Sequence, residues 1–232
     1  VRRTLRIDPP GLPQTLVVSG AIEGSSQTLD LAVPADAVPG SVRARLKLYP
    51  STFSQVLDGL DSMLSIPHGC FEQTSSATYP NIMVLNYLRT TGMAAPGVEA
   101  RARQFIQLGY QRLVGFEVRG GGFSLYGRSP ADTTLTAYGL MEFTDMADVY
   151  PVDRDLIERT ARWLGERQKR DGSWRLHSGY GSPVRSNASD TACTAYVTYA
   201  LARVNSASDA VRRGADYLRT KIEIGRASCR ER

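Results

Sequence analysis

A seven-residue pattern occurs twice in the chain and constrains its fold more than any other feature. Residues 132–138 and 190–196 both fit D-T-x-x-T-A-Y, and the two copies lie 58 positions apart. A glycine followed closely by an aromatic residue precedes each copy, at residues 122–123 and 172–174. A period of this length, with about two helical segments per unit, is typical of helical-hairpin repeats. We therefore expect a mainly α-helical fold in which hairpins curve into an α/α toroid.

Helical periodicity begins at about Ser51 and continues through most of the chain. Apolar residues recur there at a spacing of about 3.6, which places them on one face of each expected helix. Ser51 is a candidate N-cap, Pro96 suits a first helical turn, and Gly92 suits a helix end. The expected helices cover about residues 51–64, a stretch marked by 82–88 that ends near Gly92, then 96–113, 132–147, 153–169, 189–204 and 207–221.

The first 49 residues show a different period and indicate strands. Four short runs alternate apolar and polar residues or are rich in β-branched residues, at 4–7, 15–22, 28–33 and 41–48. Proline and glycine turns separate these runs. A few strands cannot bury both of their faces. We therefore expect residues 1–49 to belong to a sheet whose other strands lie elsewhere, and residues 50–222 to form the toroid, incomplete at its C-terminal end.

The last ten residues differ from the rest. Residues 223–232, E-I-G-R-A-S-C-R-E-R, resemble the translation of a common sequencing adapter and have no apolar periodicity. We interpret them as an assembly artefact and exclude them from the fold, as one would exclude a fusion scar. On this interpretation Cys229 does not belong to the protein, and the natural chain continues beyond about Ile222.

Composition narrows the range of functions. The net charge is +5 in 232 residues, and the arginines are scattered, so we expect no nucleic-acid binding. No run reaches the 18 or more apolar residues of a membrane span, and the start lacks the apolar core of a signal peptide. Cys70 and Cys193 are too few for a disulfide framework. We also expect no metal ion and no cofactor.

The stretch with the most distinctive chemistry runs from Cys70 to Gln73. A turn precedes it and a helical pattern follows it, so the side chains at positions i and i+3 can face each other. The Cys70 thiolate could then attack the Gln73 amide carbon, release ammonia and leave an internal thioester. Glu72, between them, suits the positive end of a helix dipole. The alternative is that Cys70 is a small buried hydrophobic residue and Gln73 a surface residue.

The surrounding sequence resembles a known family. Residues 67–74, P-H-G-C-F-E-Q-T, are similar to the thioester motif P-x-G-C-G-E-Q of the alpha-2-macroglobulin and complement superfamily, with Phe71 in place of the usual glycine. The likeness continues, in order, over residues 80–88, 109–112, 135–138 and 163–172, and covers essentially residues 51–220. The resemblance implies an α/α-toroid thioester domain inserted into a CUB-type β-sandwich, whose leading strands, or those of a macroglobulin-type domain, residues 1–49 would fit.

The resemblance also implies a function and a set of site residues. It implies a thioester protease inhibitor, not an enzyme, that acts outside the cytoplasm, either secreted or in a bacterial periplasm or cell envelope. Its partners would be proteases captured through lysine amines, and other domains of its own chain. Cys70 and Gln73 form the thioester pair, with Phe71 and Tyr79 as candidate aromatic covers. His177 is a candidate for the histidine that selects hydroxyl acceptors over amines.

Other functions fit the same residues. The same thioester could attach the protein to target surfaces, as a complement-like opsonin does in innate defence. A toroid without a thioester could serve as a binding module. Residues 168–174, Q-K-R-D-G-S-W, also fit the Q-x-x-x-G-x-W repeat of terpene-cyclase and prenyltransferase toroids. That enzyme class is less well supported, because the chain has no D-x-D-D acid motif and no zinc-ligand cluster.

Overall fold

The computed structural model describes residues 11–22, 24, 26, 28–177 and 189–228. The chain divides into two compact units, Val1–Pro50 and Ser51–Arg232. The helices of the second unit are α1 (Thr52–Met63), α2 (Phe71–Thr91), α3 (Pro96–Val114), α4 (Thr133–Ala147), α5 (Arg154–Glu166), α6 (Asp190–Asn205) and α7 (Asp209–Ser228). The expected helices are thus all present, close to their expected bounds.

The described part of the first unit contains no strand, although its sequence alternates as a strand would. Its apolar side chains are largely exposed, Leu12, Val17 and Leu46 among them. An extended segment forms a stable sheet only when its backbone and its apolar face find partners. The described residues show no such sheet, and the assignment of residues 1–49 to a β-sandwich domain stays a prediction.

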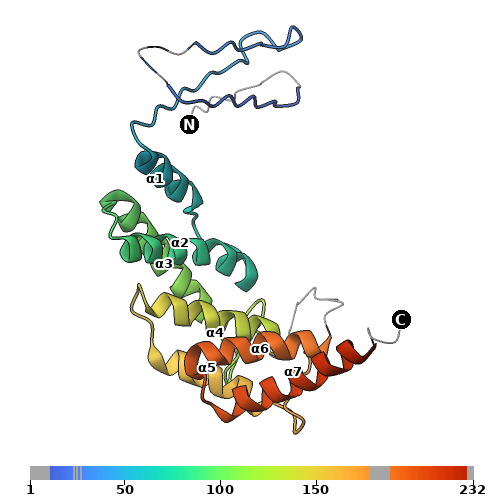
Figure 1. Ribbon diagram of the computed structural model, residues 1–232. Coiled ribbons are helices and arrows are strands. Elements are labelled where there is room, and N and C mark those ends of the chain that lie inside the picture. The colour runs from blue at the N-terminus through green and yellow to red at the C-terminus, as the bar shows by residue number, and fades with distance from the viewer. Residues whose placement is uncertain (1–10, 23, 25, 27, 178–188, 229–232) are drawn as a thin grey trace. The chain divides into compact units, whose positions relative to one another are not determined.

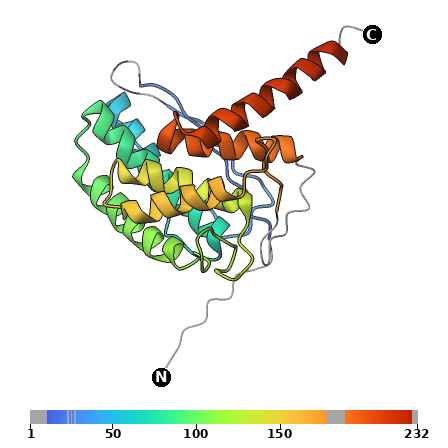
Figure 2. The same cartoon turned by 90° about the horizontal axis from the view of Figure 1, so that it is seen from below.

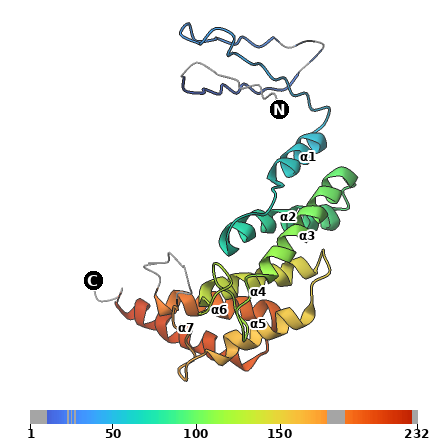
Figure 3. The same cartoon turned by 180° about the vertical axis from the view of Figure 1, so that it is seen from behind.

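The second unit is built from three helical hairpins. α2 packs against α3, α4 against α5, and α6 against α7, while α4 also contacts both α2 and α6. Figures 1 and 3 show α4 and α6 side by side, and Figure 2 shows the C-terminal end of α7 extending beyond them. Helices α2, α4 and α6 thus form one layer, and their hairpin partners form the other. This arrangement confirms the mainly α-helical prediction.

Local sequence signals explain where the helices begin and end. Ser51 and Ser54 form a capping box at the start of α1, and the Asp132 side chain accepts hydrogen bonds from two backbone amides of α4. Gly92 ends α2 in the left-handed conformation. Helix α7 continues to Ser228, through the first residues of the tail that we interpreted as an artefact. That interpretation stays a prediction.

The repeated D-T-x-x-T-A-Y pattern docks a loop onto the start of each inner helix. The Thr136 hydroxyl accepts a hydrogen bond from the Phe123 backbone N–H at 2.8 Å, and the Thr194 hydroxyl accepts one from the Trp174 N–H at 2.9 Å. Each hydroxyl also donates to the carbonyl four residues earlier in its own helix, at 2.6 Å. Phe123 and Trp174 are fully buried. The repeat therefore fixes an aromatic anchor beneath each helix start.

The Q-x-x-x-G-x-W stretch makes contacts of the same structural kind. The Trp174 indole N–H donates to the Leu164 carbonyl at 2.7 Å. The Gln168 amide donates to the carbonyls of Gly172 and Ala210, at 3.0 and 2.8 Å. These bonds tie the loop to α5 and α7, so helix–loop packing accounts for the pattern.

Among the described helices, none is long and apolar enough to cross a membrane.

Candidate functional site

Cys70 and Gln73 meet at the start of α2. Cys70 is the N-cap residue, and Gln73 is the third residue of the helix. The Cys70 backbone N–H donates to the Gln73 side-chain oxygen Oε1 at 3.1 Å, which is the glutamine half of a capping box. The Cys70 sulfur takes the place of a capping serine's hydroxyl, opposite the Gln73 backbone N–H. The helix start therefore folds the Gln73 carboxamide back onto the Cys70 backbone, and the pairing of the two side chains in a thioester stays a prediction.

Gly69 makes room for the Gln73 carbonyl group. Gly69 has a φ of +77°, a backbone conformation that side-chain-bearing residues rarely adopt. A Cβ atom at this position would lie 2.0 Å from Gln73 Oε1 and 2.8 Å from its Cδ. The glutamine side chain thus folds back directly over Gly69, which is possible only because this residue has no side chain.

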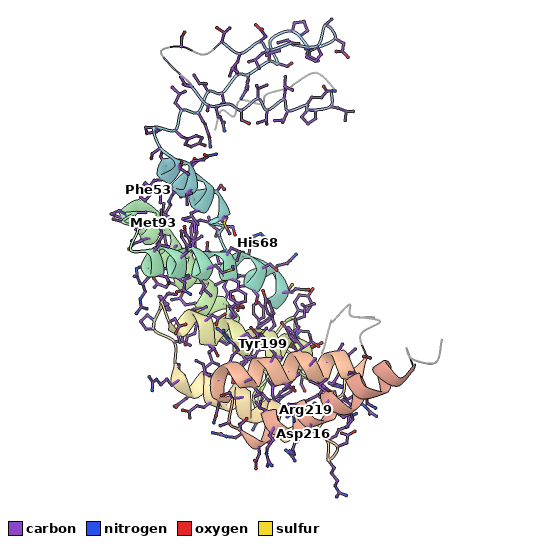
Figure 4. All side chains as sticks on the ribbon, in the orientation of Figure 1. Phe53, His68, Met93, Tyr199, Asp216 and Arg219 are labelled. Carbon is purple, nitrogen blue, oxygen red and sulfur yellow. The ribbon has the colours of Figure 1, made fainter. Side chains whose placement is uncertain are left out.

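The side chains of Arg112 and Thr74 donate hydrogen bonds to the backbone of the turn. Arg112, on α3, donates from Nη2 to the Gly69 carbonyl oxygen at 2.9 Å. The buried Thr74 hydroxyl donates to the His68 carbonyl at 3.1 Å. The His68 side chain itself is exposed on the link between α1 and α2 (Figure 4). The motif backbone is therefore fixed by both helices of the first hairpin.

Phe71 is a core residue and not an exposed cover. Its side chain is fully buried, with its ring 5.4 Å from that of Phe123 and 6.0 Å from that of Phe116. A Cβ at Gly139 on α4 would lie 3.0 Å from the Phe71 ring, so α4 passes directly over it. Among the described residues only glycines have positive φ, so the Phe71 backbone needs no glycine. The bulky residue after the cysteine is therefore compatible with the turn.

The glycine-rich loop at residues 120–127 lies between α3 and α4 in the chain. Its contacts link the start of α2 to the start of α4. The Leu125 carbonyl accepts a hydrogen bond from the Phe71 N–H at 3.0 Å, and Phe123 pairs with Asp132 just before α4. Thr133 is the first residue of α4, and its backbone N–H donates to the His177 carbonyl at 3.2 Å. His177 thus lies at the N-terminal end of α4 with an exposed side chain. The residues that follow it, 178–188, lie outside the described part of the chain.

Tyr79 lies away from the motif, at the junction of three helices. Its hydroxyl donates to Asp145 of α4 at 2.5 Å, and Asp145 also pairs with Arg203 of α6. Nine residues of helix separate it from Cys70, about 13 Å along the axis at 1.5 Å per residue. Burial and the Asp145 carboxylate raise the pKa of its hydroxyl. Its contacts are those of an interhelix anchor, and none of them leads to Cys70.

A buried carboxyl group lies among tyrosines next to this junction. Glu142, on α4, is fully buried, and no described group hydrogen-bonds to either of its oxygens. Burial raises its pKa to about 8, and the neighbouring Ser75 hydroxyl opposes that rise. Burial, and next the Glu142 charge, raise the pKa of Tyr138 and of Tyr196 to about 12. The exposed Glu72 of the motif adds a smaller contribution at Tyr138.

Glu142 gives the domain a defined pH dependence. In the unfolded chain its carboxyl ionises near the ordinary value of 4.5, whereas in the folded chain it stays protonated until about pH 8. The unfolded state therefore binds fewer protons across this window, and stability falls as pH rises from about 4.5 to 8. The loss is on the order of 5 kcal/mol if the whole pKa difference applies.

We expect Glu142→Gln to remove this part of the pH dependence, because the amide cannot ionise. Urea unfolding at pH 5, 6, 7 and 8 measures the slope, with Glu158→Gln, an exposed glutamate of α5, as the matched control. The same downward slope in the Glu142→Gln variant as in the wild type and the control would contradict this assignment.

Sequence reasoning identified Cys70, Glu72 and Gln73 but missed Gly69, Thr74 and Arg112. A local signal for the Gly69 contact was present. C-x-x-Q is a capping-box pattern with cysteine in place of serine or threonine, and in a capping box the glutamine side chain folds back over the residues before the helix. The contact of Arg112 with Gly69 spans 43 residues of sequence and depends on the packing of α3 against α2. No local pattern reveals such a contact.

The comparison with protein families agrees with this geometry. The family model described as the A-macroglobulin TED domain matches residues 43–228, which is most of the chain and includes every described helix. Its range contains the Cys70–Gln73 turn, both copies of the repeat and the loops that join them. The chain therefore belongs to the A-macroglobulin TED domains, the thioester domains of the alpha-2-macroglobulin and complement superfamily.

Proposed function

We propose that Cys70 and Gln73 form an internal thioester through which the protein covalently captures proteases. The observation that carries the proposal is the capping box, which holds Gln73 Oε1 at 3.1 Å from the Cys70 N–H. In the bond-forming step Cys70 Sγ attacks Gln73 Cδ, the C–N bond breaks, and ammonia leaves with the thiol proton. Oε1 remains as the thioester carbonyl oxygen.

The capture step uses the same acyl carbon. A lysine amine of the protease attacks Gln73 Cδ, the C–S bond breaks, and the amine proton passes to the departing sulfur. The products are an amide to the protease and a free Cys70 thiol. The thiolate is a far better leaving group than the amide nitrogen it replaced, which makes a thioester an acyl donor that an unmodified glutamine is not.

A thioester at this position needs protection from water. Gln73 is exposed and Cys70 half-buried, while Phe71 closes only the inner side of the turn. We propose that other domains of the same polypeptide cover the outer side until a protease cleaves the protein. Proteins of the alpha-2-macroglobulin and complement superfamily are generally extracellular, so we place the protein in a secreted, extracellular or bacterial periplasmic or cell-envelope compartment.

Covalent capture of proteases can be distinguished from general surface tagging by comparing adduct formation with an active protease and with the same protease inactivated at its active site. We expect active protease to form an adduct that survives boiling in detergent and reductant, whereas protease inactivated at its active site does not. Cys70→Ala should form no adduct with either. Equal adducts with the inactivated protease, or with a bystander protein, would instead indicate opsonin-like tagging.

We propose that His177 selects the acceptor. An imidazole that attacks the thioester first gives an acyl-imidazole and frees the Cys70 thiolate as a base, which favours transfer to hydroxyl groups. His177→Ala should therefore raise the ratio of methylamine to glycerol incorporation by about tenfold or more. His68→Ala, which removes another exposed histidine close to the motif, is the control. An unchanged ratio in His177→Ala would refute the role.

A further inference from the structure

The peptide group that joins Gly69 to Cys70 is hydrogen-bonded at both ends. Its oxygen, on Gly69, accepts from Arg112 Nη2 at 2.9 Å. Its N–H, on Cys70, donates to Gln73 Oε1 at 3.1 Å. One planar amide therefore connects the guanidinium of α3 to the carbonyl oxygen of the reactive glutamine.

Hydrogen bonds arranged in such a chain strengthen one another. A charged donor on the oxygen of an amide draws electron density from its nitrogen, and the N–H becomes a stronger donor. Because thioester formation displaces the nitrogen of Gln73, the oxygen at the end of this chain is the one that the thioester keeps. When a nucleophile adds to Gln73 Cδ, negative charge develops on this oxygen, where a preorganised donor is most effective.

We infer that Arg112 is a positioning residue that polarises the Gln73 acyl carbonyl through the Gly69–Cys70 peptide. The inference rests on the proposed thioester and specifies how this carbonyl is activated. Arg112 does not touch the reacting atoms. In the accelerated step, an amine adds to Cδ, the C–S bond breaks, and the amine proton moves to Cys70 Sγ.

Close packing of the first hairpin brings Arg112 to this place. A Cβ at Gly109 of α3 would lie only 2.1 Å from the Thr78 hydroxyl of α2, so the two helices touch at this glycine. Arg112 lies three residues after Gly109, and Thr74 four residues before Thr78, so both are about one turn nearer the motif on the facing sides. The packing of α3 against α2 therefore places the Arg112 guanidinium at the Gly69 oxygen.

The test compares two arginines of the same helix. Arg112→Met removes the bond to Gly69, whereas Arg103→Met removes an arginine bond to the Val149 carbonyl, 3.2 Å long in the wild type and remote from the motif. We expect Arg112→Met to slow methylamine-driven release of the Cys70 thiol about 3- to 10-fold. Arg103→Met should leave this rate unchanged. Arg112→Lys, which keeps a charged donor, should recover most of it.

A second measurement does not need a thioester. In a Cys70→Ala background, the backbone N–H remains and Gln73 stays an amide, so its Cδ carbon-13 shift reports polarisation of the carbonyl directly. We expect Arg112→Met, but not Arg103→Met, to move this shift upfield. Equal thiol-release rates in the wild type and Arg112→Met, or an unmoved shift, would overturn the inference. A wild-type protein without a thioester would overturn the proposed function, and the shift would still decide whether the carbonyl is polarised through this peptide.

Discussion

Gly69→Ala is expected to abolish the thioester while leaving the fold intact. The new Cβ would lie 2.0 Å from Gln73 Oε1, too close for any real contact, so the glutamine side chain has to leave the position over the turn. Its oxygen then loses the Cys70 N–H, the hydrogen bond that orients its Cδ for the proposed attack by the thiol. We expect methylamine-reactive thioester to fall to below about a tenth of the wild-type amount. Titration of the thiol released by methylamine measures this quantity.

Gly92→Ala is the matched control for this variant. Gly92 ends the same helix with a φ of +66°, so alanine meets a similar backbone strain there, about 1–2 kcal/mol. No atom lies within 4 Å of a Cβ at Gly92, so no contact is disturbed. Both variants should lose similar stability, and only Gly69→Ala should lose the thioester. Normal thioester content in Gly69→Ala would refute the placement of Gln73 over the turn.

Phe71→Gly is expected to cost more stability than any other change in the motif. The buried ring contacts Phe116 and Phe123, and removing a buried phenylalanine typically costs about 3–5 kcal/mol. Glycine inside a helix adds about 1 kcal/mol. Although this change restores the usual family residue, we expect the variant to be destabilised by about 4–6 kcal/mol in urea unfolding.

Phe53→Gly separates the two contributions. Phe53 lies in α1 with 45% of its side chain exposed (Figure 4), so its replacement carries mainly the helix penalty of about 1 kcal/mol. Where Phe71→Gly remains folded, it should still form the thioester, because neither the capping box nor Gly69 involves the ring. A stability loss no larger than that of Phe53→Gly would show that Phe71 is not part of the core.

The helices could be predicted because their signals are local. An apolar period of about 3.6 marks the helices, and Ser51, Gly92, Pro96 and Asp132 each act at a helix end within a few residues. The strands expected in residues 1–49 had an equally local pattern, but a sheet needs neighbouring strands, and the described part of this segment forms no strand. A local sequence pattern thus predicts a helix, whose hydrogen bonds lie within one segment, better than a strand, whose hydrogen bonds depend on other segments.

The site was predictable to the same limited extent. The spacing of Cys70 and Gln73 predicted that the two residues meet at one helix turn, and their reactivity stays a prediction. Part of the surroundings of this pair, Arg112 and the aromatic contacts of Phe71, comes from other helices and loops, and so the sequence did not reveal it. Phe71 packs beneath the turn and Tyr79 binds Asp145, and their expected role as covers of a thioester stays a prediction. Arg112 reaches the motif only because α3 packs against α2 at Gly109.

The mass of the intact native protein tests the central claim most directly. A Cys70–Gln73 thioester predicts a mass ~17 Da below that of the unmodified sequence, because ammonia has been lost. Methylamine should then add ~31 Da to Gln73 and expose one new thiol at Cys70. An unmodified mass, with Cys70 titratable before any treatment and no methylamine incorporated, would contradict the account.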